Sequence, residues 1–226
     1  MTIFSYRRVA ASNMNPITNL DKLKDAAEAG NINLLYAVFQ DDPSILENID
    51  SIQFIETPLH IAASTGHFRF AIEVMNLKPS FAWKLNPQGF SPVHLAMQNE
   101  QKRMVSRFVD IDRDLVRVKG KEGLTPLHFA SQIGDVELLT YFLYACPDSI
   151  EDVTVGGETA LHIAVKNNNY EVLHLLVYFL RKNYKRGARK LECKILNWKD
   201  EDDNTILHIS ALNNRPQVIY PLLIFT

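Results

Sequence analysis

The sequence predicts an all-α solenoid of about six helix-turn-helix repeats joined by short hairpin-like turns. One observation is a four-residue segment, typified by Thr57-Pro58-Leu59-His60, that occurs five times. A second is its spacing, because the histidines that end the segments are 34, 34, 34 and 46 residues apart, and a fixed period in this range indicates a stacked array of repeats. A third is the apolar run that follows each segment with the spacing of one helix face. The five histidines are His60, His94, His128, His162 and His208.

Each copy opens with the start of a first helix. The hydroxyl residue at the head of the segment can accept a hydrogen bond from a free amide of the first turn. In three copies a proline follows at the first helical position, where its missing N–H costs nothing. Small residues such as Ala62 and Ala63 come next and let neighbouring helices approach closely. The hydroxyl residues are Thr57, Ser91, Thr125, Thr159 and Thr205.

A second helix follows in each copy after a short turn. Gly66 and Gly134 stand between the two helices in two copies, and Glu100, Asn168 and Asn214 take the equivalent places in others. Glycine and asparagine tolerate the left-handed backbone that ends many helices. The apolar run beyond the turn then forms the second helix, so the repeating unit is predicted to be a helical hairpin.

Together these residues resemble the ankyrin repeat. The resemblance covers roughly residues 21–224 in six copies, with residues 1–20 as an N-terminal extension. In the degenerate first copy, Ala26–Asn31 aligns with Ala62–His67, and Asp21 takes the place of Thr57. The resemblance implies that the five histidines tie adjacent loops together by hydrogen bonds. The expected repeats lie near 21–54, 55–88, 89–122, 123–156, 157–202 and 203–226.

Ankyrin repeats also carry a glycine two residues before the threonine, at a turn with positive φ. Gly89, Gly123 and Gly157 match this position, and Asp203 can adopt the same conformation. At the equivalent position of the second copy stands Ile55, for which a left-handed backbone would cost about 1–2 kcal/mol. We therefore expect the turn before the second copy to be longer or reshaped.

A recurring segment beyond the second helix narrows the resemblance. Three of its four copies carry a proline at the second position. A proline ends a helix by removing a donor and crowding the preceding turn. The pattern resembles plant ankyrin-repeat proteins of the Bian Da and accelerated-cell-death type, a group associated with defence signalling whose array precedes a C-terminal membrane domain. Membership of that group implies a cytoplasmic array, at the cytoplasmic face of the plasma membrane in full-length relatives. The segments are Asp42–Leu46, Lys78–Ala82, Asp112–Val116 and Cys146–Ile150.

The two ends of the chain leave alternatives open. No stretch approaches the roughly 18 apolar residues that a membrane-spanning helix requires, and Pro221 falls inside the last expected helix. We interpret this end as a truncated form of a longer, membrane-anchored relative that could compete with it; the alternative is an apolar tail that docks on a partner. Residues 1–20 contain Arg7, Arg8 and no acid, which fits a disordered extension or a transit segment, and Met14 could equally be the start.

Composition and motifs argue against catalysis. The formal net charge of −2 gives no general reason to expect a nucleic acid partner. Cys146 and Cys193 lack metal-ligand spacing, which suits a reducing compartment. Gly156-Gly157 belongs to a repeat turn and not to a phosphate-binding loop. In the sequence, no acid or cysteine is positioned to orient His174 as a catalytic base. We expect no enzyme activity, no cofactor and no metal.

Function is therefore expected on the surface of the array, as capture of a protein or peptide on the concave face. Phe90, Leu124 and Ile133 are apolar at expected solvent positions, so they either anchor a partner or pack on neighbouring tips. An alternative function is a ligand-responsive regulatory domain that binds a small molecule or ion between repeats. The candidate partner-binding residues are Phe54, Gln88, Phe90, Gln98, Asn99, Glu122, Leu124, Gln132, Ile133, Glu158, Lys166 and Asn167.

The longer last step of 46 residues indicates a twelve-residue basic insertion near 181–194. It carries seven cations against one acid, Glu192, and basic side chains near an anionic leaflet are each worth about 1 kcal/mol. We expect either a patch for an anionic membrane or acidic partner, or a solvated loop. The acidic run Asp200–Asp203 follows and would pair with the patch or repel the same membrane. The cations are Arg181, Lys182, Lys185, Arg186, Arg189, Lys190 and Lys194.

Overall fold

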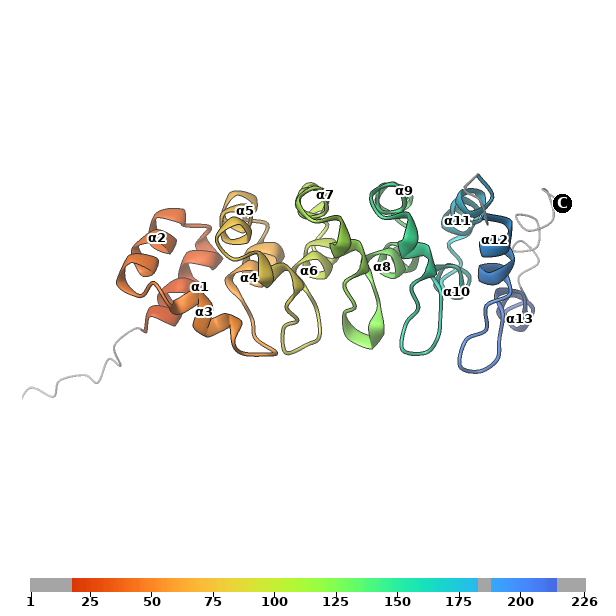
Figure 1. Cartoon of the computed structure of the whole chain (residues 1–226), viewed down its shortest axis with the longest axis horizontal. Helices are drawn as coiled ribbons and strands as arrows, with labels where there is room; N and C mark the ends of the chain where they lie inside the picture. Colours follow the sequence, from red (N-terminus) through yellow and green to blue (C-terminus); the bar gives the residue numbers. More distant parts are fainter. Residues whose placement is uncertain (1–17, 183–187, 215–226) are drawn as a thin grey trace, which may run out of the picture.

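The recurring segments fold into paired helices that stack side by side. The computed structural model describes residues 18–182 and 188–214. Figure 1 shows an elongated row of helix pairs, with the second helices α5, α7 and α9 along one side and the loops along the other. Within the described ranges the chain forms helices and one isolated bridge, between Phe54 and Leu85. The predicted all-α solenoid is therefore confirmed.

We call the first helix of each pair inner and the second outer. The inner helices are α1 (Asn19–Ala29), α4 (Pro58–Thr65), α6 (Pro92–Gln98), α8 (Pro126–Ile133), α10 (Ala160–Lys166) and α13 (Ile206–Leu212). The outer helices are α2 (Ile32–Asp41), α5 (Phe68–Leu77), α7 (Lys102–Ile111), α9 (Val136–Ala145) and α11 (Tyr170–Lys182).

The motif hydroxyl residues stand at the N-cap of their inner helices, as predicted, but the expected cap bond is not made in every copy. The Oγ1 atoms of Thr57 and Thr125 accept a hydrogen bond from the amide three residues later, whereas the Ser91 hydroxyl makes no cap bond and lies 2.7 Å from Nδ1 of His94. In the first copy the N-cap is Thr18 and not Asp21. Asp21 instead closes a capping box with Thr18. Its backbone amide donates to the Thr18 hydroxyl at 3.2 Å, and its carboxylate accepts from the Thr18 backbone amide at 3.1 Å. The alignment of Asp21 with Thr57 was therefore wrong for the cap.

The turns between inner and outer helices adopt the predicted left-handed conformation. Gly66 has a φ of 81°, and Glu100 takes the same place with a φ of 56°. A Cβ on Gly66 would lie 2.8 Å from the side-chain nitrogen of Gln101. The positive φ thus favours glycine at this position, and a larger residue would also displace the Gln101 side chain, whereas the Glu100 turn already holds a larger residue.

Short helices follow the outer helices and anchor the loops. The outer helix α5 ends at Leu77 and α9 ends at Ala145, in each case two residues before the proline that was expected to stop it. Phe81 and Ile150 in the next segments are fully buried or nearly so. The short helices are α3 (Ile45–Asp50), η1 (Pro79–Trp83), η2 (Arg113–Arg117), η3 (Lys121–Gly123) and η4 (Pro147–Glu151).

The loop before the second copy is reshaped, as Ile55 required. Ile55 is absent from the residues with positive φ. Its amide donates to the carbonyl of Leu85 at 3.3 Å, beside the Phe54–Leu85 bridge. The loop therefore runs extended against the next loop, and the isoleucine avoids the strained conformation.

The described part of the basic insertion contains a helix, α12 (Ala188–Leu196). The expectation of a loop is wrong for residues 188–194, because they are helical and Leu191 packs against the core; Ile195, directly after them, is fully buried. Arg7, Arg8, Met14 and Pro221 lie outside the described residues.

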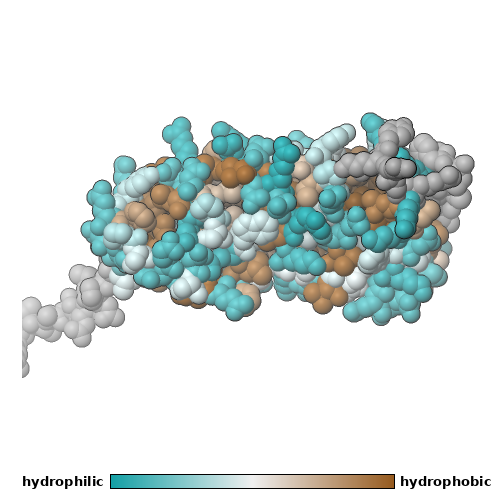
Figure 2. Space-filling view, in the orientation of Figure 1, coloured by the Kyte–Doolittle hydropathy of each residue, from teal (hydrophilic) through white to brown (hydrophobic). Residues whose placement is uncertain are grey.

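The apolar core runs along the whole row instead of forming one centre. Phe70, Phe108 and Phe142 come from three successive outer helices, and each is at most 1% exposed. Figure 2 shows hydrophilic side chains over most of one face, with apolar side chains in separate patches. Each pair is thus buried mainly by its neighbours, as in other solenoids.

Candidate functional site

The motif histidines join each inner helix to the next loop. His60, in α4, bonds through Nε2 to the carbonyl oxygens of Lys84 and Phe90, each at 3.1 Å. His208 keeps the bond to Thr205 within its own motif, and the residues that would follow lie outside the described part. The equivalent pairs are His94–Leu124 at 3.0 Å, His128–Glu158 at 3.2 Å and His162–Asn204 at 3.3 Å. The predicted loop-tying role is therefore observed for four histidines.

Hydrogen bonding and burial keep these imidazoles neutral. A carbonyl oxygen can only accept, so Nε2 carries the proton, while Nδ1 of His60 accepts from the Thr57 amide at 3.2 Å. Burial lowers the pKa of His60, His94 and His128 from 6.5 to about 4. Burial also lowers the pKa of His162. These residues act as structural links, which leaves binding to the surface around them.

The inner helices present one repeated face. Ile61, Leu95 and Phe129 each follow a motif histidine and are half-buried apolar side chains. Residues three and four positions later lie on the same helical face, and at these places stand the predicted binding residues Gln98 and Asn99 after Leu95 and Gln132 and Ile133 after Phe129. This apolar row, which we call the inner stripe, was missed in the sequence. The 34-residue period could have revealed it.

The loop tips show a range of exposure. Nine of the twelve predicted binding residues are exposed, whereas Phe90, Leu124 and Glu158 are half-buried. The Phe90 ring lies 6.4 Å from the His94 ring, and the amides of Asn99 and Asn167 donate to their own helices. The exposed residues are Phe54, Gln88, Gln98, Asn99, Glu122, Gln132, Ile133, Lys166 and Asn167.

One ion-pair group joins a tip to an inner helix. The Lys166 ammonium, at the end of α10, contacts the carboxylates of Glu158 and of Asp200, the latter at 3.7 Å. Glu158 belongs to the preceding tip and Asp200 to the following loop. Lys166 therefore links the loops on both sides of α10. We call the loop tips together with the exposed sides of the inner helices the inner face.

The acidic run does not pair with the described cations of the insertion. Asp200 is buried and accepts from the amides of Asp202 and Asn204 at 3.1 and 2.8 Å, which closes its own loop. Asp203 pairs with Lys199 at 3.1 Å. The run thus shapes the hairpin turn before α13.

Within the basic insertion, part of the charge is used internally. Arg181 pairs with Glu192 at 2.7 Å, and Lys194 pairs with Glu151 at 2.9 Å. Lys190 is exposed. Lys185, Arg186 and the Arg189 side chain lie outside the described residues. Binding of this patch to an anionic membrane stays a prediction, with fewer available cations than the sequence suggested.

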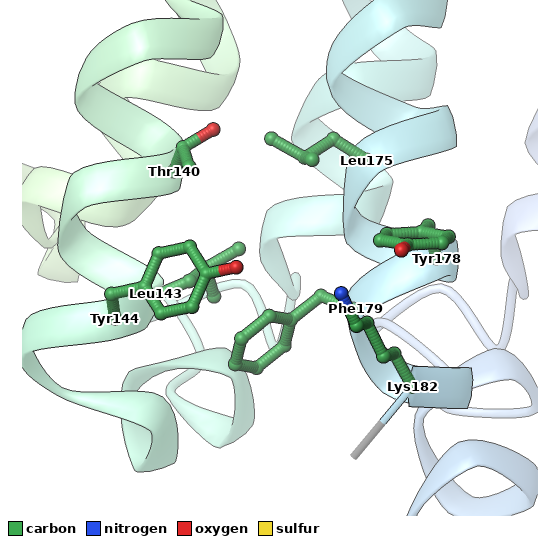
Figure 3. Close-up of a pocket in the computed structure, with 7 residues that line it drawn as sticks. All are labelled: Thr140, Leu143, Tyr144, Leu175, Tyr178, Phe179 and Lys182. Carbon is green, nitrogen blue, oxygen red and sulfur yellow. The ribbon is translucent and has the colours of Figure 1, made fainter.

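A small apolar pocket lies between the outer helices α9 and α11. Its volume is about 220 Å³. Tyr144 and Phe179 meet edge-on across it at 6.4 Å, and the Lys182 ammonium lies 5.4 Å from the Tyr178 ring centroid. Figure 3 shows the side chains of the two helices converging on this space. The remaining lining residues are Thr140, Leu143 and Leu175.

Residues 18–182 and 188–214 contain no helix that combines the length and the apolar character needed to cross a bilayer. No group of three or more histidine, cysteine, aspartate or glutamate side chains is placed to hold a metal ion in the same residues. Cys146 and Cys193 are free thiols.

Comparison with known proteins agrees with the geometry. The family model described as ankyrin repeats (3 copies) matches residues 103–187 and, in an overlapping match, 127–225. The chain is 46% identical over 70 residues to Ankyrin repeat-containing protein BDA1 of Arabidopsis thaliana. That region is 31% of this chain and only 16% of the relative's length. It supports the predicted resemblance to the Bian Da type.

A solved structure shares the fold. One chain from the complex of the predatory endopeptidase Bd0816 of Bdellovibrio bacteriovorus with the immunity protein Bd3460 superposes with a TM-score of 0.65. The superposition covers 91% of this chain and 98% of that chain, at 18% identity, so the likeness concerns the fold alone. Because the family model covers more than half of the sequence and the stacked hairpins match it, this chain belongs to the ankyrin-repeat family, whose arrays are protein-interaction modules.

Proposed function

We propose that this chain is a non-catalytic module that captures a protein or peptide on its inner face. The observation that carries the proposal is the continuity of that face: the inner stripe runs through three successive repeats, and Lys166 joins a helix end to the loops beside it. Half-buried apolar side chains surrounded by polar ones are typical of binding surfaces. An extended peptide or a helix lying along the row would meet one apolar contact per repeat.

We further propose that the module acts as a scaffold or sensor in plant defence signalling. The support is the 46% identity with an Arabidopsis ankyrin-repeat protein over 70 residues, together with the recurring proline segments. The proposed location is the cytoplasm, at the inner side of the plasma membrane where a longer relative is anchored. Binding would then be coupled to the response through that relative.

Two pairs of substitutions test the binding face. Leu95→Ser with Phe129→Ser breaks the inner stripe, whereas Tyr36→Ser with Ile111→Ser changes the same number of apolar side chains at exposed positions of the outer helices. Both proteins would be expressed in plant tissue, and neighbouring proteins would be labelled and quantified by mass spectrometry. The amount of labelled partner protein should fall at least about tenfold with the stripe variant, which corresponds to a loss of about 1.4 kcal/mol in binding free energy. It should be unchanged with the control variant.

The readout needs two safeguards. Thermal melting of each variant confirms that the array is folded, since the stripe is partly buried. A defence-marker assay in the same tissue tests the signalling role separately from binding. An unchanged set of partners with the stripe variant would place the binding surface elsewhere.

A second candidate function is a ligand-responsive regulatory domain, and the pocket between α9 and α11 is the observation that favours it. Its apolar walls with Lys182 at one side suit a small molecule with an apolar body and an acidic group. The probe would be anilinonaphthalene sulfonate, which combines both features, followed by calorimetry. Phe179→Asp should abolish that binding, and equal binding by both proteins would exclude this pocket.

A further inference from the structure

Four charged residues stand at the same place in four successive repeats. Arg69, Arg103, Glu137 and Glu171 follow one another at steps of 34 residues, and each is the second residue of an outer helix. All four side chains are exposed. The sign changes once along the row, so two repeats that each contribute a cation are followed by two repeats that each contribute an anion.

The basic half of this row lines a groove. The groove measures about 430 Å³ and lies beside the turns at Gly66 and His67. The Arg103 guanidinium stacks over the Phe68 ring, 4.3 Å from its centroid. Among the described residues, no carboxylate forms an ion pair with Arg69 or Arg103. Both charges therefore face solvent on a surface already shaped for contact.

Glu171, in the acidic half of the row, lines a second groove along the same edge, of about 660 Å³. Glu100, Asp135 and Glu171 belong to its lining, together with the half-exposed apolar side chain of Ile133. Lys102 pairs with Asp135 at 2.7 Å and with Glu137 at 3.2 Å. One lysine offsets only part of this charge, so the second groove is net negative.

The spacing makes the edge complementary to itself. Stacked helices are about 8–10 Å apart, and Figure 1 shows the outer helices in one regular row. Consider a two-fold axis that crosses this row at right angles between α7 and α9. It would bring Arg69 of one copy to Glu171 of the other and Arg103 to Glu137, and each contact would occur twice. Such a self-complementary surface is what a two-fold dimer requires.

We propose that this edge, from Arg69 to Glu171, is a self-association surface and that its partner is a second copy of this chain. Exposed ion pairs are individually weak and screened by salt, so the dimer is reversible and dissociates as ionic strength rises. The edge lies at the turns between inner and outer helices, away from the loop tips. Dimerisation would cover Ile133 but leave the loop tips and the inner stripe of both copies available, which would increase the apparent affinity for a partner with two binding segments.

Charge reversal tests the proposal. Sedimentation equilibrium of the 226-residue chain should show a dimer at low salt (about 50 mM) that is lost at high salt (about 500 mM). The Arg69→Glu/Arg103→Glu variant makes the whole edge acidic, and Glu137→Arg/Glu171→Arg makes it basic. Each variant alone should raise the dimer dissociation constant at least about tenfold. An equimolar mixture of the two should associate again, because the acidic edge then meets the basic one.

A matched control separates this contact from a general charge effect. Lys119→Glu with Lys121→Glu changes the net charge by the same amount as Arg69→Glu/Arg103→Glu. Both positions are exposed, one just before η3 and one within it, so this variant should leave the dimer intact. The proposal is overturned if the unmodified chain is monomeric at low salt, if reversal has no effect, or if the mixture stays monomeric. A monomer that binds a polyglutamate peptide through Arg69 and Arg103 would assign the basic groove to an external acidic partner instead.

Discussion

The Nε2 atom of His94 donates a hydrogen bond of 3.0 Å to the carbonyl oxygen of Leu124, 30 positions later in the chain. The imidazole is 1% exposed, so both groups are removed from water. A buried carbonyl without a donor would be costly, and a protonated ring would be costly as well. The same link recurs between successive repeats, which makes the neutral form of histidine a condition for stacking.

Mild acid should therefore destabilise the array. The folded pKa of His60, His94 and His128 is about 4, below the ordinary value of 6.5. Between these values the unfolded chain binds more protons, so stability is complete above pH 6.5 and is lost as pH falls toward 4. At pH 4.5 the loss is about 2.5 kcal/mol for each histidine, since one pKa unit corresponds to about 1.4 kcal/mol. Urea unfolding at pH 7 and pH 4.5 measures it.

Two variants isolate this effect from the titration of acids. His94→Gln should lower stability at pH 7 but reduce the loss between pH 7 and pH 4.5. His174→Gln, at an exposed histidine of α11, should leave that loss unchanged. An unaltered pH dependence in His94→Gln would show that protonation of this ring does not oppose folding.

A methyl group near His94 should disturb the same link. An added Cβ at Gly120 would lie 2.9 Å from Cε1 of His94 and 3.2 Å from the Gly89 carbonyl oxygen. Because the ring is buried and held by Leu124, Gly120→Ala should cost about 1–3 kcal/mol, as overpacking does elsewhere. The control is Gly156→Ala, where the nearest atom to the new Cβ is 3.8 Å away. Equal melting temperatures for the two variants would contradict the prediction.

The parts of the fold that recur were predictable from the sequence. A cap at Thr57, a left-handed turn at Glu100 and the histidine links each depend on residues at fixed offsets, and repetition identifies them. The first copy departs from the pattern, so the cap at Thr18 could not be found by alignment with the later copies. Helix α12 occurs once, and its only local signal is the spacing of four between Leu191 and Ile195.

The exposure of the candidate binding residues was predictable in part, and their role in binding stays a prediction. Exposure at the ends of the inner helices follows from helical periodicity, and Gln98 and Gln132 are exposed as expected. The Lys166–Asp200 contact joins residues 34 positions apart, across a segment that contains the insertion. Such contacts depend on how the loops fold back, which no local pattern records.

The contact between Arg117 and Asp152 couples two repeats through a paired hydrogen bond. The Arg117 Nε atom lies 2.9 Å from Oδ2 of Asp152, and Nη2 lies 2.5 Å from Oδ1. Lysine cannot reproduce this planar two-point contact. Arg117→Lys should therefore cost about 1 kcal/mol, measured by urea unfolding. Arg113→Lys, at an exposed residue of the same short helix, should be neutral, and a similar cost for both would indicate a general effect of arginine.

An ion pair between Arg181 and Glu192 joins α11 to α12. The Arg181–Glu192 pair is largely shielded, with side chains 18% and 20% exposed, whereas the Lys102–Glu137 pair is 48% and 81% exposed. Glu192→Gln should therefore cost about 1–2 kcal/mol, while Glu137→Gln should cost less than about 0.5 kcal/mol. Because α12 can open without unfolding the array, the measurement is amide hydrogen exchange in α12, which should accelerate about tenfold in Glu192→Gln. Unchanged exchange in α12 would mean that the buried Ile195, and not the ion pair, holds the helix in place.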